Sequence, residues 1–163
     1  MHIRTARLTD AEAIRGIYNR AILTVATFDL EPRSLEEQQQ WLAMRSGAHL
    51  VLVADAGSSL AGFASLSPYR DRPAYRTTVE NSVYVDESFQ GKGVGKQLMS
   101  ELVDSARDHG FHSVIARIVS SNAASIALHR AVGFEIVGVE KEVGRKLGRW
   151  LDVVVMQRML SGR

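Results

Sequence analysis

Three glycines stand within five positions of FQGKGVGKQLM, which covers residues 89–99. Gly91, Gly93 and Gly95 come just before a segment whose apolar residues have helical spacing. Glycine inside a helix costs about 1 kcal/mol relative to alanine, so we expect the cluster at a helix entrance. Unpaired N–H groups there, together with the helix dipole, bind phosphate. The sequence therefore predicts a phosphate-binding turn.

The spacing of these glycines excludes two nucleotide-binding motifs. A P-loop requires G-x-x-x-x-G-K-[ST], whereas Lys96 is followed by Gln97 and lacks a glycine at the required offset. A dinucleotide fingerprint requires G-x-G-x-x-G, whereas this chain has G-x-G-x-G. A module that binds nucleotide phosphates through either motif is thus disfavoured.

The segment TTVENSVYV, residues 77–85, precedes the glycine turn and reads as a β-strand. Alternation puts Thr78, Glu80, Ser82 and Tyr84 on one face. A carboxylate in the middle of a strand is unfavourable by propensity, although a wet face of an antiparallel sheet would tolerate it. Because the strand leads directly into the turn, we favour a functional role for Glu80.

The other elements are expected on both sides of this region. Helical periodicity and caps predict helices over 11–25, from the Ser34/Glu37 capping box, over 93–109, and over 122–133. Strands are expected over 2–8, 49–54, 60–67, 112–119, 134–144 and 149–159, and PYRDRPAYR, residues 68–76, is expected to be a loop. The order β-α-α-β-β-β-α-β-α-β-β predicts a mixed α/β sheet in one domain, residues 1–163.

Composition narrows the class of protein. The 163 residues are 45% hydrophobic and 23% charged, and 20 Lys+Arg against 18 Asp+Glu give a net charge of +2. Such figures are ordinary for a globular protein, and they do not suggest a nucleic-acid partner. With no cysteine, disulfides and thiolate sites are excluded. No apolar stretch reaches the ~20 residues of a membrane span, and MHIRTARLTD has no signal-peptide core; we expect a cytoplasmic protein.

Two motifs carry a resemblance to a known family. Gln90, Gly93 and Gly95 form Q-x-x-G-x-G, which resembles the pyrophosphate-binding signature of the GCN5-related N-acetyltransferases (GNAT). The segment NAASIALHRAVGF resembles the family's second motif, and the element order is similar to the GNAT fold. The segments RTTVENSVYV, GRWLDVVVMQ and IYNRAILTVATFD resemble the phosphinothricin and methionine sulfone N-acetyltransferase branch, across nearly the whole chain.

This resemblance implies a fold, an activity and partners. The fold would be a mixed, mostly antiparallel sheet with helices on both faces. The activity would be transfer of the acetyl group of acetyl-CoA, without a metal, to the α-amine of a small amino-acid-like substrate. That substrate could be phosphinothricin, methionine sulfone or sulfoximine, or a common L-amino acid. A homodimer is also implied, with no nucleic acid or membrane as partner.

The resemblance also implies residues that hold acetyl-CoA. The strand backbone would pair with the pantetheine arm, the turn would bind pyrophosphate, and an Asn would bond near the thiol. The implied residues are Val83, Tyr84, Val85, Gln90, Gly91, Lys92, Gly93, Val94, Gly95, Lys96 and Asn122. As alternatives, the lysine side chains are merely solvated, and Asn122 is an N-cap, which does not exclude cofactor contact.

Catalysis and substrate binding are assigned by the same resemblance. Glu80 would take the proton of the amine, directly or through water, and His129 would protonate the leaving thiolate, where many relatives have tyrosine. No second His, Asp or Glu lies at metal-ligand spacing with His129, so no metal is expected. Arg70, with Arg72 and Arg76 as competitors, would hold an α-carboxylate. Phe28 and Ser82 would complete the substrate site, although Phe28 also suits a core position.

Two rival functions remain open. One is an acyl-CoA-binding sensor without catalysis, which the joint presence of Glu80, Asn122 and His129 disfavours. The other is a peptide or protein N-acetyltransferase of the same fold, which the arginine-bearing loop over 68–76 weakly disfavours.

Overall fold

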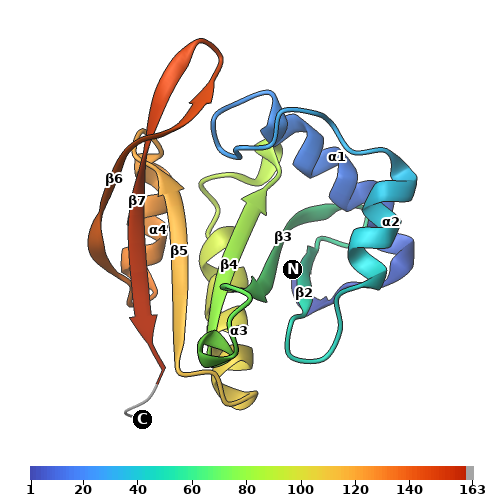
Figure 1. Ribbon diagram of the computed structural model, residues 1–163. Coiled ribbons are helices and arrows are strands. Elements are labelled where there is room, and N and C mark those ends of the chain that lie inside the picture. Colours follow the sequence, from blue (N-terminus) through green and yellow to red (C-terminus); the bar gives the residue numbers. More distant parts are fainter. Residues whose placement is uncertain (161–163) are drawn as a thin grey trace.

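The computed structural model describes residues 1–160, in which a seven-stranded sheet lies between two layers of helices (Figure 1). The strands are β1 (His2–Thr5), β2 (Val51–Asp55), β3 (Leu60–Pro68), β4 (Thr78–Val85), β5 (Ser113–Val119), β6 (Glu135–Lys146) and β7 (Arg149–Met159). The helices are α1 (Ala11–Ile22), α2 (Leu35–Ala43), α3 (Val94–Asp108) and α4 (Ala123–Ala131). Short 3-10 turns cover Leu8–Asp10, Pro73–Tyr75 and Glu87–Phe89.

The strand order in the sheet is β1-β2-β3-β4-β5-β7-β6. All neighbours are antiparallel except β4 and β5, which are parallel and joined through α3. This arrangement confirms the predicted element order and the mixed, mostly antiparallel sheet. None of the helices within residues 1–160 is long and apolar enough to cross a membrane.

Each face of the sheet has its own hydrophobic core. The amphipathic helix α3 buries Leu98, Met99 and Leu102 against one face, with α4 beside it. On the opposite face α1 and α2 pack over Phe63 and Val53. The alternation in β4 follows these cores, because Val79 points to the α3 layer and Tyr84 to the α1 layer. Glu80 and Ser82 therefore share the α1 and α2 face.

The strands β4 and β5 separate halfway along β4. Their pairing covers only Thr78 to Glu80 of β4, opposite Ser113 to Ile115 of β5. On its other side β4 stays paired with β3 as far as Val85. The edge of β4 that faces β5 is consequently without a strand partner beyond Glu80, and this opening lies directly before the glycine turn.

The helix α1 is shorter than the sequence suggests. It ends at Ile22, so Val25, which the periodicity placed on its buried face, lies in the following loop. Leu23 still has helical dihedrals as the C-cap residue, and Thr24 caps the end by donating its hydroxyl to the carbonyl of Ala21. The early end frees the segment 24–29 to reach the functional site.

Candidate active site

The glycine turn has the geometry of an anion cradle. Gly91 and Gly93 have φ of 75° and 82°, and a Cβ built on either would meet no atom within 4 Å. Gly93 is the N-cap residue of α3 and offers no side-chain cap. The N–H groups of the first turn therefore face open space, which a phosphate group fits. A Cβ at either glycine would fill part of that space.

Gly95 lies where α3 packs against α4. A Cβ at this position would lie 2.9 Å from Cδ2 of Leu128 on α4 and 3.6 Å from Cγ2 of Val85. A larger residue here would require the Leu128 side chain to shift, because α3 and α4 approach closely. This packing is an additional constraint on Gly95, and the contact of its N–H group with the pyrophosphate stays a prediction.

The opening between β4 and β5 contains two adjoining cavities, which together form a groove. A small cavity of about 80 Å³ lies between the strands and includes Val83, Tyr84, Asn122 and His129. A larger one of about 450 Å³ continues past Val85 and Gln90 toward α1. Both share Ala26, Val83, Tyr84 and Asn122 in their lining. A long ligand could thus run from the glycine turn to the middle of the sheet, beside the unpaired edge of β4.

Asn122 caps a helix and also lines the groove. Its side-chain oxygen accepts a hydrogen bond from the N–H of Ser125 at 3.1 Å, so it is the N-cap of α4. It also lines both parts of the groove. The capping bond holds the side chain in place and leaves its amide N–H₂ group for a ligand.

Two buried side chains meet at the inner end of the groove. His129 is 2% exposed and Asn81 is 6% exposed, and both line the small cavity. The Asn81 Nδ2 group lies 3.0 Å from His129 Nε2. Asn81 Oδ1 is buried and has no hydrogen-bond partner within residues 1–160. Since a buried acceptor without a partner is costly, this oxygen is suited to receive a donor from a ligand.

Glu80 lies where the two strands separate, on the face that carries α1 and α2. Burial raises the pKa of its carboxyl group above the usual value, while the charges of Arg117 and Arg70 oppose this rise and that of Glu140 adds to it. A carboxylate with a raised pKa is a better proton acceptor at neutral pH. The position and chemistry of Glu80 therefore suit a general base.

Arg117 and Glu140 are neighbours of this carboxylate that sequence reasoning missed. They form an ion pair of 2.6 Å across β5 and β6. A signal was present, since Arg117 is a lone charge within the apolar run VIARIV of β5. Arg117 is the exposed residue of this strand, so Glu140 and solvent compensate its charge.

The loop after α1 is held over the site by the β6–β7 hairpin (Figure 1). The Lys146 ammonium group donates to the carbonyl of Thr27 at 2.8 Å and is buried. Next to it, Phe28 packs so closely on Gly144 that a Cβ there would overlap the ring. Phe28 is 42% exposed, so it is an accessible aromatic side chain rather than a core residue.

The polar residues of the turn have local partners. Gln90 donates to the carbonyl of Val85 at 3.3 Å and so ties the turn to the end of β4. The ammonium group of Lys92 donates to the carbonyl of Ser88 at 3.1 Å, and Lys96 is exposed on the first turn of α3. Each lysine side chain would have to move to contact an anion bound at the turn. Without such movement, the lysines can attract the anion only through their nearby positive charge.

The predicted substrate arginines lie on the loop between β3 and β4. Arg70 is exposed, its guanidinium carbon is 4.8 Å from the centre of the Tyr69 ring, and its charge acts on Glu80. Arg72 is also exposed, and within residues 1–160 its side chain makes no hydrogen bond or ion pair. Of the two, Arg70 is the better placed to bind a group next to Glu80.

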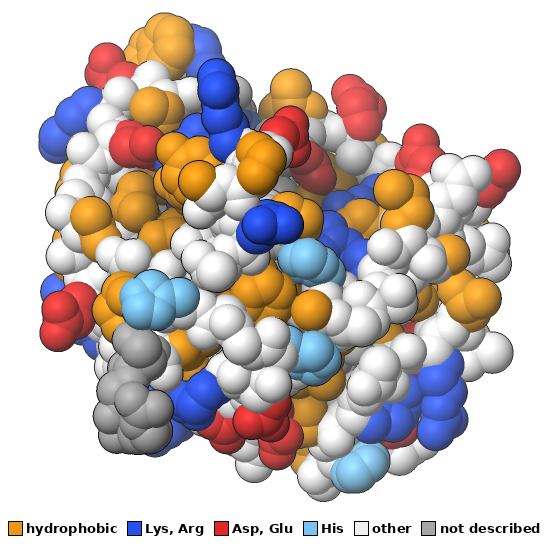
Figure 2. Space-filling model, turned by 60° about the horizontal axis from the view of Figure 1, so that its bottom comes forward, with side chains coloured by type: hydrophobic (Ala, Val, Ile, Leu, Met, Phe, Trp, Pro, Cys, Tyr) orange, Lys and Arg blue, Asp and Glu red, His pale blue; other side chains and the backbone are white. Residues whose placement is uncertain are grey.

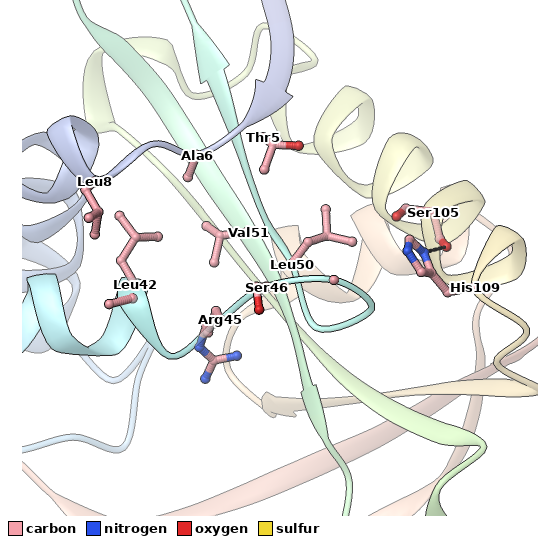
Figure 3. Close-up of a pocket in the computed structure, with 12 residues that line it drawn as sticks. Thr5, Ala6, Leu8, Leu42, Arg45, Ser46, Leu50, Val51, Ser105 and His109 are labelled. Carbon is pink, nitrogen blue, oxygen red and sulfur yellow. Dashed lines mark hydrogen bonds between the residues drawn. The ribbon is translucent and has the colours of Figure 1, made fainter.

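A further cavity lies away from this site. It measures about 590 Å³ and is formed by the loop after α2, the end of β1 and the last turns of α3, including Ser105 and His109 (Figure 3). The glycine turn is at the opposite end of α3. Hydrophobic, histidine and charged side chains are interspersed on the face turned forward in Figure 2. Neither Glu80 nor any residue of the β4–β5 opening contributes to this cavity.

A strand that leaves its parallel neighbour, an uncapped glycine turn and a carboxylate with a raised pKa together define an acyltransferase that holds a phosphate-bearing acyl carrier. Residues 3–155 match the family described as "Acetyltransferase (GNAT) domain". The chain belongs to this family.

Proteins that are named acetyltransferases resemble the chain over nearly its whole length. A curated L-methionine sulfoximine/L-methionine sulfone acetyltransferase of Pseudomonas paraeruginosa is 43% identical over 162 residues, 98% of this chain and 94% of the relative. A crystal structure of a phosphinothricin acetyltransferase from Sinorhizobium meliloti in complex with acetyl-CoA superposes with a TM-score of 0.92 at 40% identity, covering 97% and 87% of the two chains. A ribosomal-protein-alanine N-acetyltransferase from Brucella melitensis gives 0.95 at 42% identity, covering 98% and 99%. The chain is accordingly an acetyl-CoA-dependent N-acetyltransferase.

Proposed function

We propose that this enzyme acetylates the α-amine of a small amino-acid-like substrate such as methionine sulfone, methionine sulfoximine, phosphinothricin or a common L-amino acid. The observation that carries the proposal is the position of Glu80. Its carboxylate, with a raised pKa, stands where the acyl-binding opening begins and on the face where Arg70 supplies a cation. An α-amine and an α-carboxylate on one carbon match this pair of charges.

The residues divide the work according to their positions. The turn residues Gly91 and Gly93 would hold the pyrophosphate, and the unpaired edge of β4 at Val83 to Val85 would hydrogen-bond the pantetheine arm, which when bound presents the acetyl thioester. Glu80 accepts a proton from the substrate ammonium group, because an α-amine with a pKa of about 8 is mostly protonated at neutral pH. Arg70 orients the substrate through its carboxylate.

His129 can act as the predicted acid only if one of its hydrogen bonds to the protein breaks. Both of its ring nitrogens have protein partners, Asn81 and Ser125, and burial lowers its pKa. Protonation of a thiolate by His129 would require one of these bonds to break. We therefore propose that His129 chiefly positions Asn81, a residue that lines the small cavity.

The decisive experiment is release of free thiol from acetyl-CoA by the purified protein. Phosphinothricin, methionine sulfone, methionine sulfoximine and the common L-amino acids are compared with amines that lack the carboxylate. Turnover with amino acids and none with simple amines is expected. Thiol release that no amine increases, or binding of acetyl-CoA without any turnover, would favour the sensor instead.

A second candidate is acetylation of a protein N-terminus, for which the name of the Brucella melitensis neighbour is the supporting observation. A peptide beginning with alanine belongs in the same assay. Faster turnover with the peptide than with any free amino acid would favour this function.

We also propose a cytoplasmic homodimer. The edge strand β6 and the hairpin tip expose apolar side chains, between 44% and 65% accessible: Ile136, Val137, Val139, Val143, Leu147 and Trp150. Such an edge is an association surface, and the lack of cysteine agrees with a reducing compartment.

Light scattering should give a dimer for wild type and for Met44→Lys, an exposed site on another surface, and a monomer for Val139→Lys. A monomeric wild-type protein would contradict the proposal.

A further inference from the structure

A separate pocket of about 120 Å³ opens on the α1 and α2 face of the sheet, and we call it the arginine pocket. Aromatic rings form its walls, and hydroxyl and guanidinium groups line it: Tyr18, Arg33, Trp41, Arg45, Phe63, Ser65, Ser67, Ser82 and Tyr84. Its volume is roughly four times the ~30 Å³ that one water molecule takes in the liquid. It has room for a group of a few heavy atoms and not for an extended peptide.

The arginine pocket holds more positive than negative charge. The guanidinium carbons of Arg33 and Arg45 lie 5.1 Å and 4.2 Å from the centre of the Trp41 ring. Burial and the charge of Arg33 lower the pKa of Arg45. Within residues 1–160 the one carboxylate within ion-pair distance of either is Asp29, 3.8 Å from Arg33 and itself 55% exposed. The two partly buried guanidinium groups thus have a single carboxylate near them, at the limit of ion-pair distance. Burying charges in this way is unfavourable unless a further anion or a strong hydrogen-bond acceptor is present.

Both guanidinium groups keep unused hydrogen-bond donors. Arg45 Nη1 donates to the carbonyl of Leu66 at 2.9 Å and to Ser67 Oγ at 2.8 Å. Arg33 Nη1 donates to Oε1 of the fully buried Gln38 at 3.2 Å. The Nε and Nη2 groups of both arginines have no hydrogen-bond acceptor among the described residues. The Nη1 bonds fix the two side chains, and the remaining N–H groups are available to a ligand.

The pocket adjoins the proposed catalytic base. Ser67 stands directly opposite Glu80 in the β3–β4 pair, where facing Cα atoms are about 5 Å apart. Ser82 and Tyr84 line both the arginine pocket and the small cavity between β4 and β5. The arginines whose charges act on Glu80 are Arg117 and Arg70, so the guanidinium groups of the arginine pocket lie farther from its carboxyl group.

We propose that Arg33 and Arg45 bind the far end of the substrate side chain and select amino acids that end in a tetrahedral, oxygen-bearing group such as a sulfonyl or phosphinate. This inference rests on the proposed function, because it assumes that the amine lies at Glu80 and the α-carboxylate at Arg70. The two donors would bind the oxygens, the serines Ser65, Ser67 and Ser82 would add hydroxyl groups, and the rings of Trp41 and Phe63 would contact a terminal methyl group.

The test compares L-methionine with L-methionine sulfone, which differ only in two oxygens on sulfur. Wild type is expected to have the higher kcat/KM for the sulfone. Arg45→Met should lower kcat/KM for the sulfone by about 10–100-fold, the effect of one lost charge-assisted hydrogen bond, and change it for methionine less than about 3-fold. Arg45→Lys should recover part of the loss because lysine keeps the positive charge, and only part because it lacks the planar fork of arginine. The matched control is Arg107→Met, an exposed arginine on α3.

An equal fall for both substrates would mean that Arg45 only supports the fold, and it would overturn the proposal. A second measurement does not require turnover. Methylphosphonate, which carries the tetrahedral group alone, should raise the melting temperature of wild type and of Arg107→Met but not of Arg45→Met or Arg33→Met. A wild type that methylphosphonate does not stabilise would also overturn the pocket assignment. If no amino acid releases thiol but methylphosphonate still binds, the proposed function fails and the pocket remains an oxyanion site.

Discussion

The Nδ2 group of Asn81 on β4 lies 3.0 Å from Nε2 of His129 on α4, in the wall of the cavity between β4 and β5. His129 Nδ1 lies 2.7 Å from the carbonyl of Ser125 and must donate to it. Nε2 therefore carries no proton and accepts from Asn81. This pairing defines the neutral tautomer and leaves Oδ1 of Asn81 as the free polar atom.

The first prediction follows from this buried neutral imidazole. Burial lowers the pKa of His129 below its ordinary value of about 6.5. At pH values below about 6.5, this histidine therefore binds a proton more readily in the unfolded chain than in the folded chain. Stability is then fully present above pH 6.5 and falls as the pH drops toward the folded-state pKa. His129→Gln should be less stable by about 1–3 kcal/mol at pH 7, and its stability should fall less between pH 7 and 5.

Melting curves of the two proteins at pH 7, 6 and 5 test this difference. The same variant separates positioning from acid catalysis, because glutamine can accept from Asn81 but cannot protonate a thiolate. A kcat within about 10-fold of wild type, against the ~10²–10⁴ of a positioned acid, is expected for positioning. A larger loss of kcat at unchanged acetyl-CoA affinity would restore His129 as the acid.

The second prediction concerns the cradle. Gly93→Val should abolish measurable acetyl-CoA binding in calorimetry, because the side chain would occupy the space before the first turn of α3. Valine at a φ of 82° is also strained, which alone lowers stability. Gly110→Val is the matched control, since Gly110 has a φ of 83° and equally open surroundings at the other end of α3. Wild-type affinity in a folded Gly93→Val protein would refute the cradle.

The third prediction concerns the contact between the hairpin and the loop after α1. Gly144→Ala should push the Phe28 ring aside, raise KM for the amino acid by about 3–30-fold (about 0.7–2 kcal/mol), and leave acetyl-CoA affinity unchanged. Gly138→Ala, on the same strand with nothing within 4 Å of its Cβ, should behave like wild type. Equal KM values in all three proteins would remove Phe28 from the substrate site.

The fourth prediction concerns the base. Glu80→Gln should lower kcat/KM by about 10²–10⁴-fold, and part of the loss should return at higher pH, where more of the amine is already free. In wild type, kcat/KM should fall as the pH drops through the raised pKa of Glu80. Removing the nearby cation with Arg117→Gln should raise that pKa further and move the fall to higher pH.

Two results would contradict this assignment. Near-wild-type activity of Glu80→Gln at pH 7 would make Glu80 a bystander on a wet sheet face. A loss that no pH relieves would mean that Glu80 holds the ammonium group and does not remove its proton.

The sequence by itself determined the elements and the local motifs of this protein. The capping box of Ser34 and Glu37 is present at the start of α2, Asn122 caps α4, and Gly93 precedes α3. These features depend on residues within one or two helical turns, so composition and spacing are sufficient to predict them. The alternation of TTVENSVYV likewise predicted which side chains of β4 share a face.

Only the tertiary structure decided which distant residues meet. Gly95 contacts Leu128, and Asn81 pairs with His129, although the partners are far apart in the chain. The point where β4 separates from β5 likewise depends on two distant segments. The arginine pocket likewise assembles side chains between residues 18 and 84 from two helices, two strands and two loops. Such contacts depend on how helices pack on the sheet and on strand register, and local propensity contains no information about either because it acts over a few residues only.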